Sequence, residues 1–246
     1  MIREAIDRII GLAAPNYYDY LDKDGNVALR YSDKSLHLIK PPRAAALEFY
    51  TLQGLVDYVR LDLQRGATTE GRVIHVKSPD EVIYESEIDA AFRDRETFAV
   101  AQHDPRSVFA FGAKLDPEMF NIHVQTHFAE YGDRTDKARL QELVGKLGAE
   151  SKSETEDDGI SQSVTLKAGV TLQRRAQIAN PFKLAPFRTF PEIEQPIGPF
   201  IFRVHQAGAN GVTCCLYECD NNAWKIDAVH SIADWLKDKV DVPVLA

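Results

Sequence analysis

The sequence predicts an α+β fold, with mixed and mainly antiparallel sheets and about four to five helices. Three observations favour this class. Short segments of strand-forming residues occur in both halves of the chain, amphipathic helical stripes lie among them, and the two kinds of segment do not alternate strictly. Strict alternation is typical of a doubly wound parallel sheet, so the sequence argues against that architecture.

Helices are predicted where apolar residues recur at helical spacing, best of all behind a capping residue. Thr51 can cap a stripe that contains Leu55 and Val59, and Asp116 precedes a proline at the first helical position. On the last helix, Trp224 and Trp235 are about three turns apart and are expected on its buried face. The expected helical ranges are 2–12, 51–64, 116–131, 135–148 and 222–239.

Strands are predicted where short runs of β-branched and aromatic residues are bounded by turn residues. Ser78-Pro79-Asp80 is expected to turn one strand into the next, and residues 206–211 to join an antiparallel pair near the C-terminus. The expected strands are 26–31, 35–39, 73–76, 81–88, 97–101, 159–166, 171–178, 199–204 and 212–218.

An acidic stretch divides the chain. Residues 150–159, ESKSETEDDG, contain no large apolar side chain and are expected to form a flexible loop that a glutamate-specific protease cuts first. They separate an N-terminal α+β lobe, 1–149, from a C-terminal β-rich lobe, 160–246, which a helix closes. The two lobes are expected to form one compact domain.

Charge and cysteine content limit the possible environment. The 29 basic and 37 acidic residues give a net charge of -8, which disfavours nonspecific nucleic-acid binding. No apolar window reaches the length of a membrane helix, and charged residues interrupt residues 1–14. The odd, clustered cysteines form a poor disulfide framework. We therefore expect a cytoplasmic protein, with no membrane partner and no cofactor.

The sequence contains two groups of potential metal ligands. His123 and His127 are four apart on an expected helix, but the intervening residues lack the glutamate of a zinc-protease motif, so surface or interface histidines are the favoured interpretation. Cys214 and Cys215, with His205 and His230 in reach on paper, are adjacent in an expected strand and point to opposite faces. Cys214, Cys215 and Cys219 are better explained as small apolar residues.

Carboxylates suggest little specific chemistry. Residues 22–33 begin like a calcium loop, but glycine stands at Gly25 instead of the sixth position and Asp33 instead of glutamate at the twelfth, so a reverse turn is favoured. Glu192 and Glu194 fit paired acids or a solvated loop equally well. No glycine-rich phosphate loop is present.

A basic concentration in the C-terminal part is the strongest candidate binding site. Interleaved with phenylalanines, these residues would hold a phosphate or nucleotide by charge and stacking. The favoured alternative is a loop that packs its phenylalanines into the core while the basic groups remain in water. The candidate ligand-binding residues are Arg174, Arg175, Lys183 and Arg188, and the phenylalanines are Phe182, Phe187 and Phe190.

Residues 180–202, NPFKLAPFRTFPEIEQPIGPFIF, and the later CLYECDNNAWKIDAVHSIADWL resemble the C-terminal half of the YfdQ-like family (domain of unknown function 2303). Residues 52–59, 119–131 and 161–168 resemble further family segments more loosely. The resemblance implies a bacteriophage or prophage accessory protein, present in the host cytoplasm during infection. The family supplies no catalytic residues to transfer.

Three functions follow from these patterns. The first is a non-enzymatic phage accessory protein that self-assembles into a homo-oligomer. The second is a binder that sequesters a small nucleotide-like ligand and so counteracts the defence of the host. The third and weaker one is a metal-dependent hydrolase built on His123 and His127. Self-assembly is predicted because residues 109–111, 200–202 and 242–246 are apolar segments that a monomer would have to cover.

Overall fold

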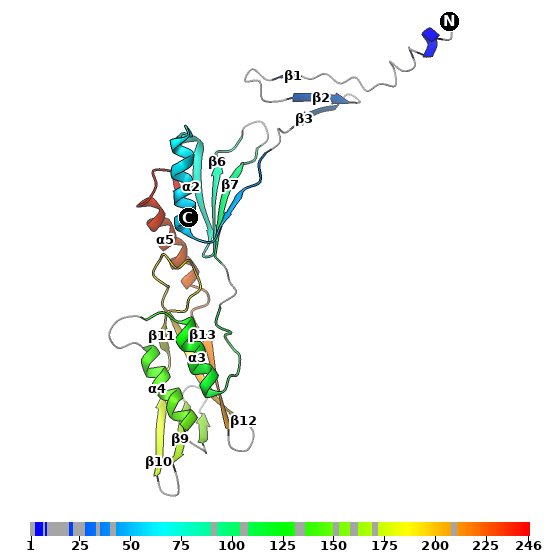
Figure 1. The fold of residues 1–246 in the computed structure, drawn as a ribbon. Helices are drawn as coiled ribbons and strands as arrows, with labels where there is room; N and C mark the ends of the chain where they lie inside the picture. The colour runs from blue at the N-terminus through cyan, green and yellow to red at the C-terminus, as the bar shows by residue number, and fades with distance from the viewer. Residues whose placement is uncertain are drawn as a thin grey trace.

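The chain folds as an α+β protein in the computed structural model (Figure 1). Most strand pairs are antiparallel, and two parallel pairs lie at the edges of the largest sheet. The structure describes residues 3–6, 8, 20–21, 28–32, 35–39, 43–89, 93–103, 108–130, 136–149, 153–157, 162–168, 172–207 and 211–246. The α+β prediction is confirmed.

One lobe is built on a five-stranded sheet of order β14-β5-β6-β7-β4. The strands are β4 (Leu47–Phe49), β5 (Arg72–Ser78), β6 (Glu81–Ser86), β7 (Thr97–Gln102) and β14 (Val244–Leu245). Helices α2 (Leu52–Gln64) and α5 (Trp224–Lys237) pack on this sheet around a shared apolar core. We call this unit the α2/α5 lobe.

Helix α2 forms where local sequence predicts it. The Thr51 hydroxyl accepts a hydrogen bond from the Gly54 N–H over 3.1 Å, which satisfies one of the donors that a helix start leaves unpaired. Leu55 and Val59 lie on the buried face. Burial of this stripe against the sheet supplies most of the stability that a helix of this length lacks in isolation.

The second unit, the α3/α4 lobe, packs two helices against a three-stranded antiparallel sheet of order β11-β12-β13. Its elements are α3 (Pro117–His127), α4 (Asp136–Ala149), β11 (Phe182–Leu184), β12 (Gly198–Ala207) and β13 (Gly211–Glu218). Phenylalanines dominate the core, and Phe120, Phe200 and Phe202 are fully buried there. Figure 1 shows this lobe below the α2/α5 lobe.

Two further sheets have three strands each. One contains β1 (Tyr20–Leu21), β2 (Ala28–Ser32) and β3 (Ser35–Ile39), and the other contains β8 (Ser153–Asp157), β9 (Gln162–Ala168) and β10 (Leu172–Ile178). The hairpins predicted at β2–β3, β5–β6 and β12–β13 are confirmed. Of the helix expected at 2–12, residues 3–6 and 8 are described and helical, whereas the turn and calcium-like loop expected from 22 onward fall largely outside the described residues.

The predicted end of helix α3 and the predicted loop at 150–159 were wrong. Helix α3 ends at His127 and not near Tyr131, because the backbone of Phe128 is extended. The Ala129 N–H donates to the Ala185 carbonyl, so pairing with residues 185–187 replaces the helical hydrogen bonds. The acidic stretch 150–159 is not simply a loop, since Ser153–Asp157 form strand β8 antiparallel to β9. An edge strand is held by main-chain bonds to one neighbour and tolerates charged side chains, so it carries no apolar signal.

The two tryptophans of α5 do not both lie in a core. Ala228 and Ile232 are fully buried, but Trp224 and Trp235 are each partly exposed. Trp235 packs against the α2/α5 core with the Lys239 ammonium 5.6 Å from its ring centroid. Trp224 lies on the first turn of α5, beyond that core, and takes part in the site described below.

The hydrophobic cores draw residues from both sides of the 150–159 stretch. The α2/α5 core combines residues before 102 with Phe190, Ile193 and the C-terminal helix, and the α3/α4 core combines α3 and α4 with β11–β13. The apolar segments that suggested self-assembly are largely covered within the chain. Phe109, Phe200 and Phe202 are buried, and the C-terminal tail forms β14 beside β5. Among the described residues, no helix is long and apolar enough to span a membrane.

Candidate functional site

The candidate site lies where the chain passes between the two lobes. The described buried residues alternate between the two cores four times along the sequence, from Ala101 to Phe109, Leu184 to Phe190, Ile193 to Phe200 and Leu216 to Ile232. Three of these crossings line one pocket of about 340 Å³. Junctions between structural units are common places for ligand pockets, and this volume is within the usual range.

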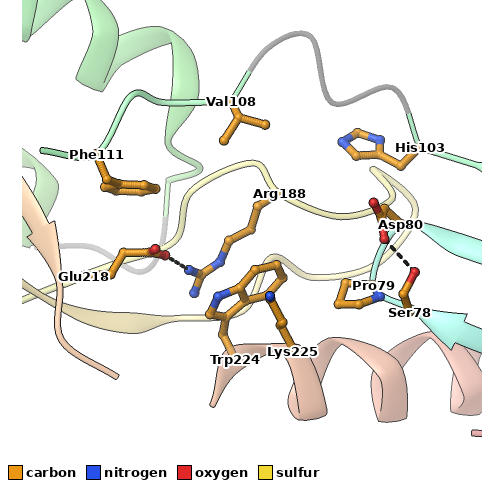
Figure 2. A pocket seen from close by; sticks show the side chains of 10 residues that line it. All are labelled: Ser78, Pro79, Asp80, His103, Val108, Phe111, Arg188, Glu218, Trp224 and Lys225. Atoms are coloured by element: carbon orange, nitrogen blue, oxygen red, sulfur yellow. Dashed lines mark hydrogen bonds and ion pairs between the residues drawn. The ribbon is translucent and has the colours of Figure 1, made fainter. Parts of the chain in front are cut away.

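Figure 2 shows how the walls of this junction pocket are arranged. Phe111, Glu218 and Arg188 come from the α3/α4 side, and the β5–β6 turn and His103 face them from the sheet. Trp224 and Lys225 close the pocket from the start of α5. The lining residues are Ser78, Pro79, Asp80, His103, Val108, Phe111, Arg188, Glu218, Trp224 and Lys225.

Arg188 is the central charged group, and its side chain is only 4% exposed. Its Nη1 donates to the Glu218 carboxylate over 2.6 Å, and its Nη2 lies 3.9 Å from Asp220 Oδ2. Burial lowers the pKa of Arg188 to about 10, while the two carboxylates oppose that shift. The guanidinium therefore remains charged at neutral pH, and its charge is balanced by the protein itself.

Glycine at position 198 permits this close approach. A Cβ there would lie 3.1 Å from Arg188 Nη2 and 3.1 Å from Asp220 Oδ2, in the space between the two charged groups. A Cβ at this position would require one of the two charged groups to shift by a few tenths of an ångström.

Buried polar contacts hold the loop that carries Arg188. The Gln195 amide oxygen accepts from the Arg188 backbone N–H over 3.0 Å, and the Gln195 amide nitrogen donates to the Phe190 carbonyl over 3.0 Å. The Thr189 hydroxyl donates to the Pro79 carbonyl in the β5–β6 turn. These bonds replace secondary structure in a proline-rich segment and attach it to the opposite lobe.

Trp224 is brought to the pocket by the turn that precedes α5. Asn221 and Asn222 have positive φ angles of 51° and 65°, a conformation that asparagine tolerates better than most residues. The indole then stacks on Arg188, with the guanidinium carbon 4.0 Å from the ring centroid. Two donors of this stacked pair, Arg188 Nε and Trp224 Nε1, are buried and have no hydrogen-bond partner among the described residues.

The four predicted basic residues do not all reach this pocket. Arg188 lines it, whereas Lys183 is an exposed residue of β11 whose backbone N–H donates to Asp136. Arg174 and Arg175 belong to β10, where they pair with Leu166 and Thr165, and their side chains lie outside the described part of the chain. Phe182 and Phe190 are in the cores, as the alternative interpretation required. Phe187, in contrast, is exposed, and the Arg188 head group is buried and not in water.

The histidine pair is packed as aromatic residues. The rings of His123 and His127 are stacked, with centroids 5.1 Å apart and planes 10° from parallel, and both contact Phe109. His127 Nδ1 also lies 3.0 Å from the His123 carbonyl oxygen of the preceding turn. Ring lone pairs lie in the ring planes, so this stack does not direct both histidines at one ion. No group of three or more potential metal ligands occurs among the described residues.

The other candidates have structural partners. Cys214 and Cys215 are buried in β13, and the exposed Cys219 thiol donates to the Pro199 carbonyl. Burial raises the pKa of Cys214 to about 12, which keeps it a thiol. Glu192 accepts from the Gln53 N–H at the start of α2 over 3.2 Å, so it supports a helix terminus and does not pair with Glu194 there.

Among the described pocket residues, the sequence predicted a ligand-binding role only for Arg188. Trp224 was noted, but for helical periodicity, and Glu218 and Asp220 carry no motif. Comparison of the chain with protein-family models, with curated proteins and with solved structures found no match.

Proposed function

We propose that this protein is a non-enzymatic binding protein that holds a small molecule in the junction pocket. The observation that carries the proposal is the junction pocket itself, a cavity of about 340 Å³ in which the stacked pair of Arg188 and Trp224 forms one wall. Concave pockets of this size, with a few charged groups among aromatic walls, are the usual form of a small-molecule site. Phe111 and Trp224 supply aromatic surface for the rest of the molecule.

A phage accessory role in the host cytoplasm belongs to the same proposal, and it rests on the resemblance of residues 180–202 and the closing helix to the YfdQ-like family. Sequestering a host molecule would require a binding pocket and no catalytic groups. The junction pocket provides a place for such a ligand.

The direct test is to isolate the native protein from its expressing cells and analyse it by mass spectrometry after denaturation, with absorbance at 260 nm as a second readout. A stoichiometric small molecule is expected in the native protein and is expected to be lost from Trp224→Ala. Lys237→Ala is the matched control, because Lys237 is an exposed residue at the other end of the same helix. Equal ligand content in both variants would place the binding site elsewhere.

Self-assembly into a homo-oligomer is a second proposal, and a different observation favours it. Strand β4 is an edge of the five-stranded sheet, and Leu47 and Tyr50 in and beside it are 50% and 68% exposed. Exposed apolar edge strands pair readily with another copy of the chain. Sedimentation velocity at micromolar concentration is expected to give a multiple of 27.6 kDa, and Leu47→Lys to reduce it. A single species at the chain mass contradicts this proposal.

A further inference from the structure

We infer that the junction pocket binds an uncharged, planar aromatic molecule, and not a phosphorylated nucleotide. This inference rests on the binding function proposed above and specifies its ligand. Two features of the pocket carry it: its charge balance and its apolar walls.

The charge balance argues against a phosphate. Glu218 Oε1 at 2.6 Å and Asp220 Oδ2 at 3.9 Å already neutralise Arg188, and Asp80 adds a further carboxylate on the opposite wall. Lys225 is the remaining lysine or arginine among the described lining residues, and it is exposed. A phosphate would bring about two negative charges toward these carboxylates in a partly desolvated space, where like charges repel strongly.

The remaining walls favour a flat, apolar body. Phe111 stacks on Phe200 at 5.3 Å, which fixes its ring, and Val108 and Pro79 add apolar surface. Aromatic walls of this kind bind planar rings by stacking and edge contacts. Nucleobases, nucleosides and pyridine carboxamides share this chemistry.

Two matched probe pairs separate charge from shape. Nicotinamide is compared with nicotinate, and adenosine with adenosine 5′-monophosphate, on the full chain carrying Trp235→Phe so that Trp224 is the sole tryptophan. Binding is read from Trp224 fluorescence. In at least one pair the uncharged member is expected to bind about tenfold or more tightly than its anionic partner.

Two variants test the assignment to these residues. Trp224→Ala removes the aromatic face on which the probe is expected to stack, and should weaken the uncharged probe about tenfold by calorimetry. Glu218→Gln removes one balancing charge, and should shift the preference toward the anionic member. Lys237→Ala should change neither value, and unfolding midpoints of all variants establish that each is folded.

The outcomes distinguish the two proposals. Anionic members that bind as tightly as the uncharged ones, or more tightly, in a Trp224-dependent manner overturn the ligand class but leave the binding function standing. Failure of all four probes, together with native protein that carries no small molecule, overturns both.

Discussion

Arg188 illustrates how one buried charge organises a site. Its guanidinium contacts Glu218, Asp220 and the face of Trp224, and it joins residues that lie 30 or more positions apart in the sequence. Interior ion pairs of this kind add little net stability compared with an apolar replacement of the whole group. Removal of one partner is far more damaging, because the opposite charge is left without compensation.

Arg188→Met is therefore expected to lower the free energy of unfolding by about 3–5 kcal/mol, since it leaves two carboxylates facing each other in a partly buried space. Urea denaturation followed by circular dichroism measures the change. The triple variant Arg188→Met, Glu218→Gln, Asp220→Asn removes the charges together and should recover much of the loss. A loss below about 1 kcal/mol in the single variant would show that the ion pair is solvated.

Cys214 provides a test of burial in the α3/α4 core. Burial is the main cause that raises its pKa from about 9 to about 12, and Asp116 and Cys215 add to it. Between these values the folded protein keeps a proton that the unfolded chain has lost, so the stabilising contribution is complete below pH 9 and declines above it. The decline is at most about 1.4 kcal/mol per pH unit for one proton.

The measurement compares the slope of unfolding free energy against pH between 9 and 11. Cys214→Ala should show a shallower decline than the wild type, whatever its stability at pH 7. Cys219→Ala is the control, because that thiol is exposed and burial has less effect on it. Equal slopes in the Cys214→Ala variant and the wild type would contradict the buried position of this thiol.

Helix α2 depends at its first turn on its own capping residue and on one group from a distant segment. The Thr51 hydroxyl accepts from Gly54 N–H, and Glu192, from the loop between the lobes, accepts from Gln53 N–H. Thr51→Ala is expected to destabilise the protein by about 1 kcal/mol, the usual value of a lost N-cap, and Thr51→Ser by much less. Thermal denaturation of the three proteins tests this, and equal melting temperatures would mean that Glu192 alone is sufficient.

Strand β14 connects the C-terminus to the first half of the chain. Val244 and Leu245 pair in parallel with Ile74 and His75, the Ile74 N–H donates to the Pro243 carbonyl over 2.9 Å, and Val242 is 3% exposed. The C-terminal tail thus packs on the five-stranded sheet of its own chain. This contact removes one of the reasons for expecting an interface between two copies of the chain at the tail.

Deletion of residues 242–246 distinguishes the two roles of the tail. We expect a loss of about 2–4 kcal/mol in unfolding free energy, from one buried valine and the strand hydrogen bonds, with unchanged particle mass. Denaturation and sedimentation together measure the two quantities. A smaller particle of unchanged stability would instead mean that the tail belongs to an interface between copies.

Local signals in the sequence were sufficient for most elements. Helices α2 and α3 begin at the residues whose side chains cap them, and the hairpin of β5 and β6 turns at the expected serine and proline. These features depend on contacts within a few residues, which is why they can be read from the sequence. Strand β8 was missed because an acidic edge strand is specified by its neighbour and not by its own residues.

The junction pocket depends on contacts between distant segments. Arg188 was noted as a basic residue in a phenylalanine-rich loop, but its burial follows from carboxylates 30 and 32 positions later and from a helix that begins at Trp224. Local periodicity placed Trp224 on a helix face, and only the packing of α5 beside the five-stranded sheet sets that face against Arg188. Composition and capping thus specify the elements of this protein. The site exists because three chain crossings bring residues from separate elements into one partly desolvated space, where their charges and hydrogen bonds must be satisfied together.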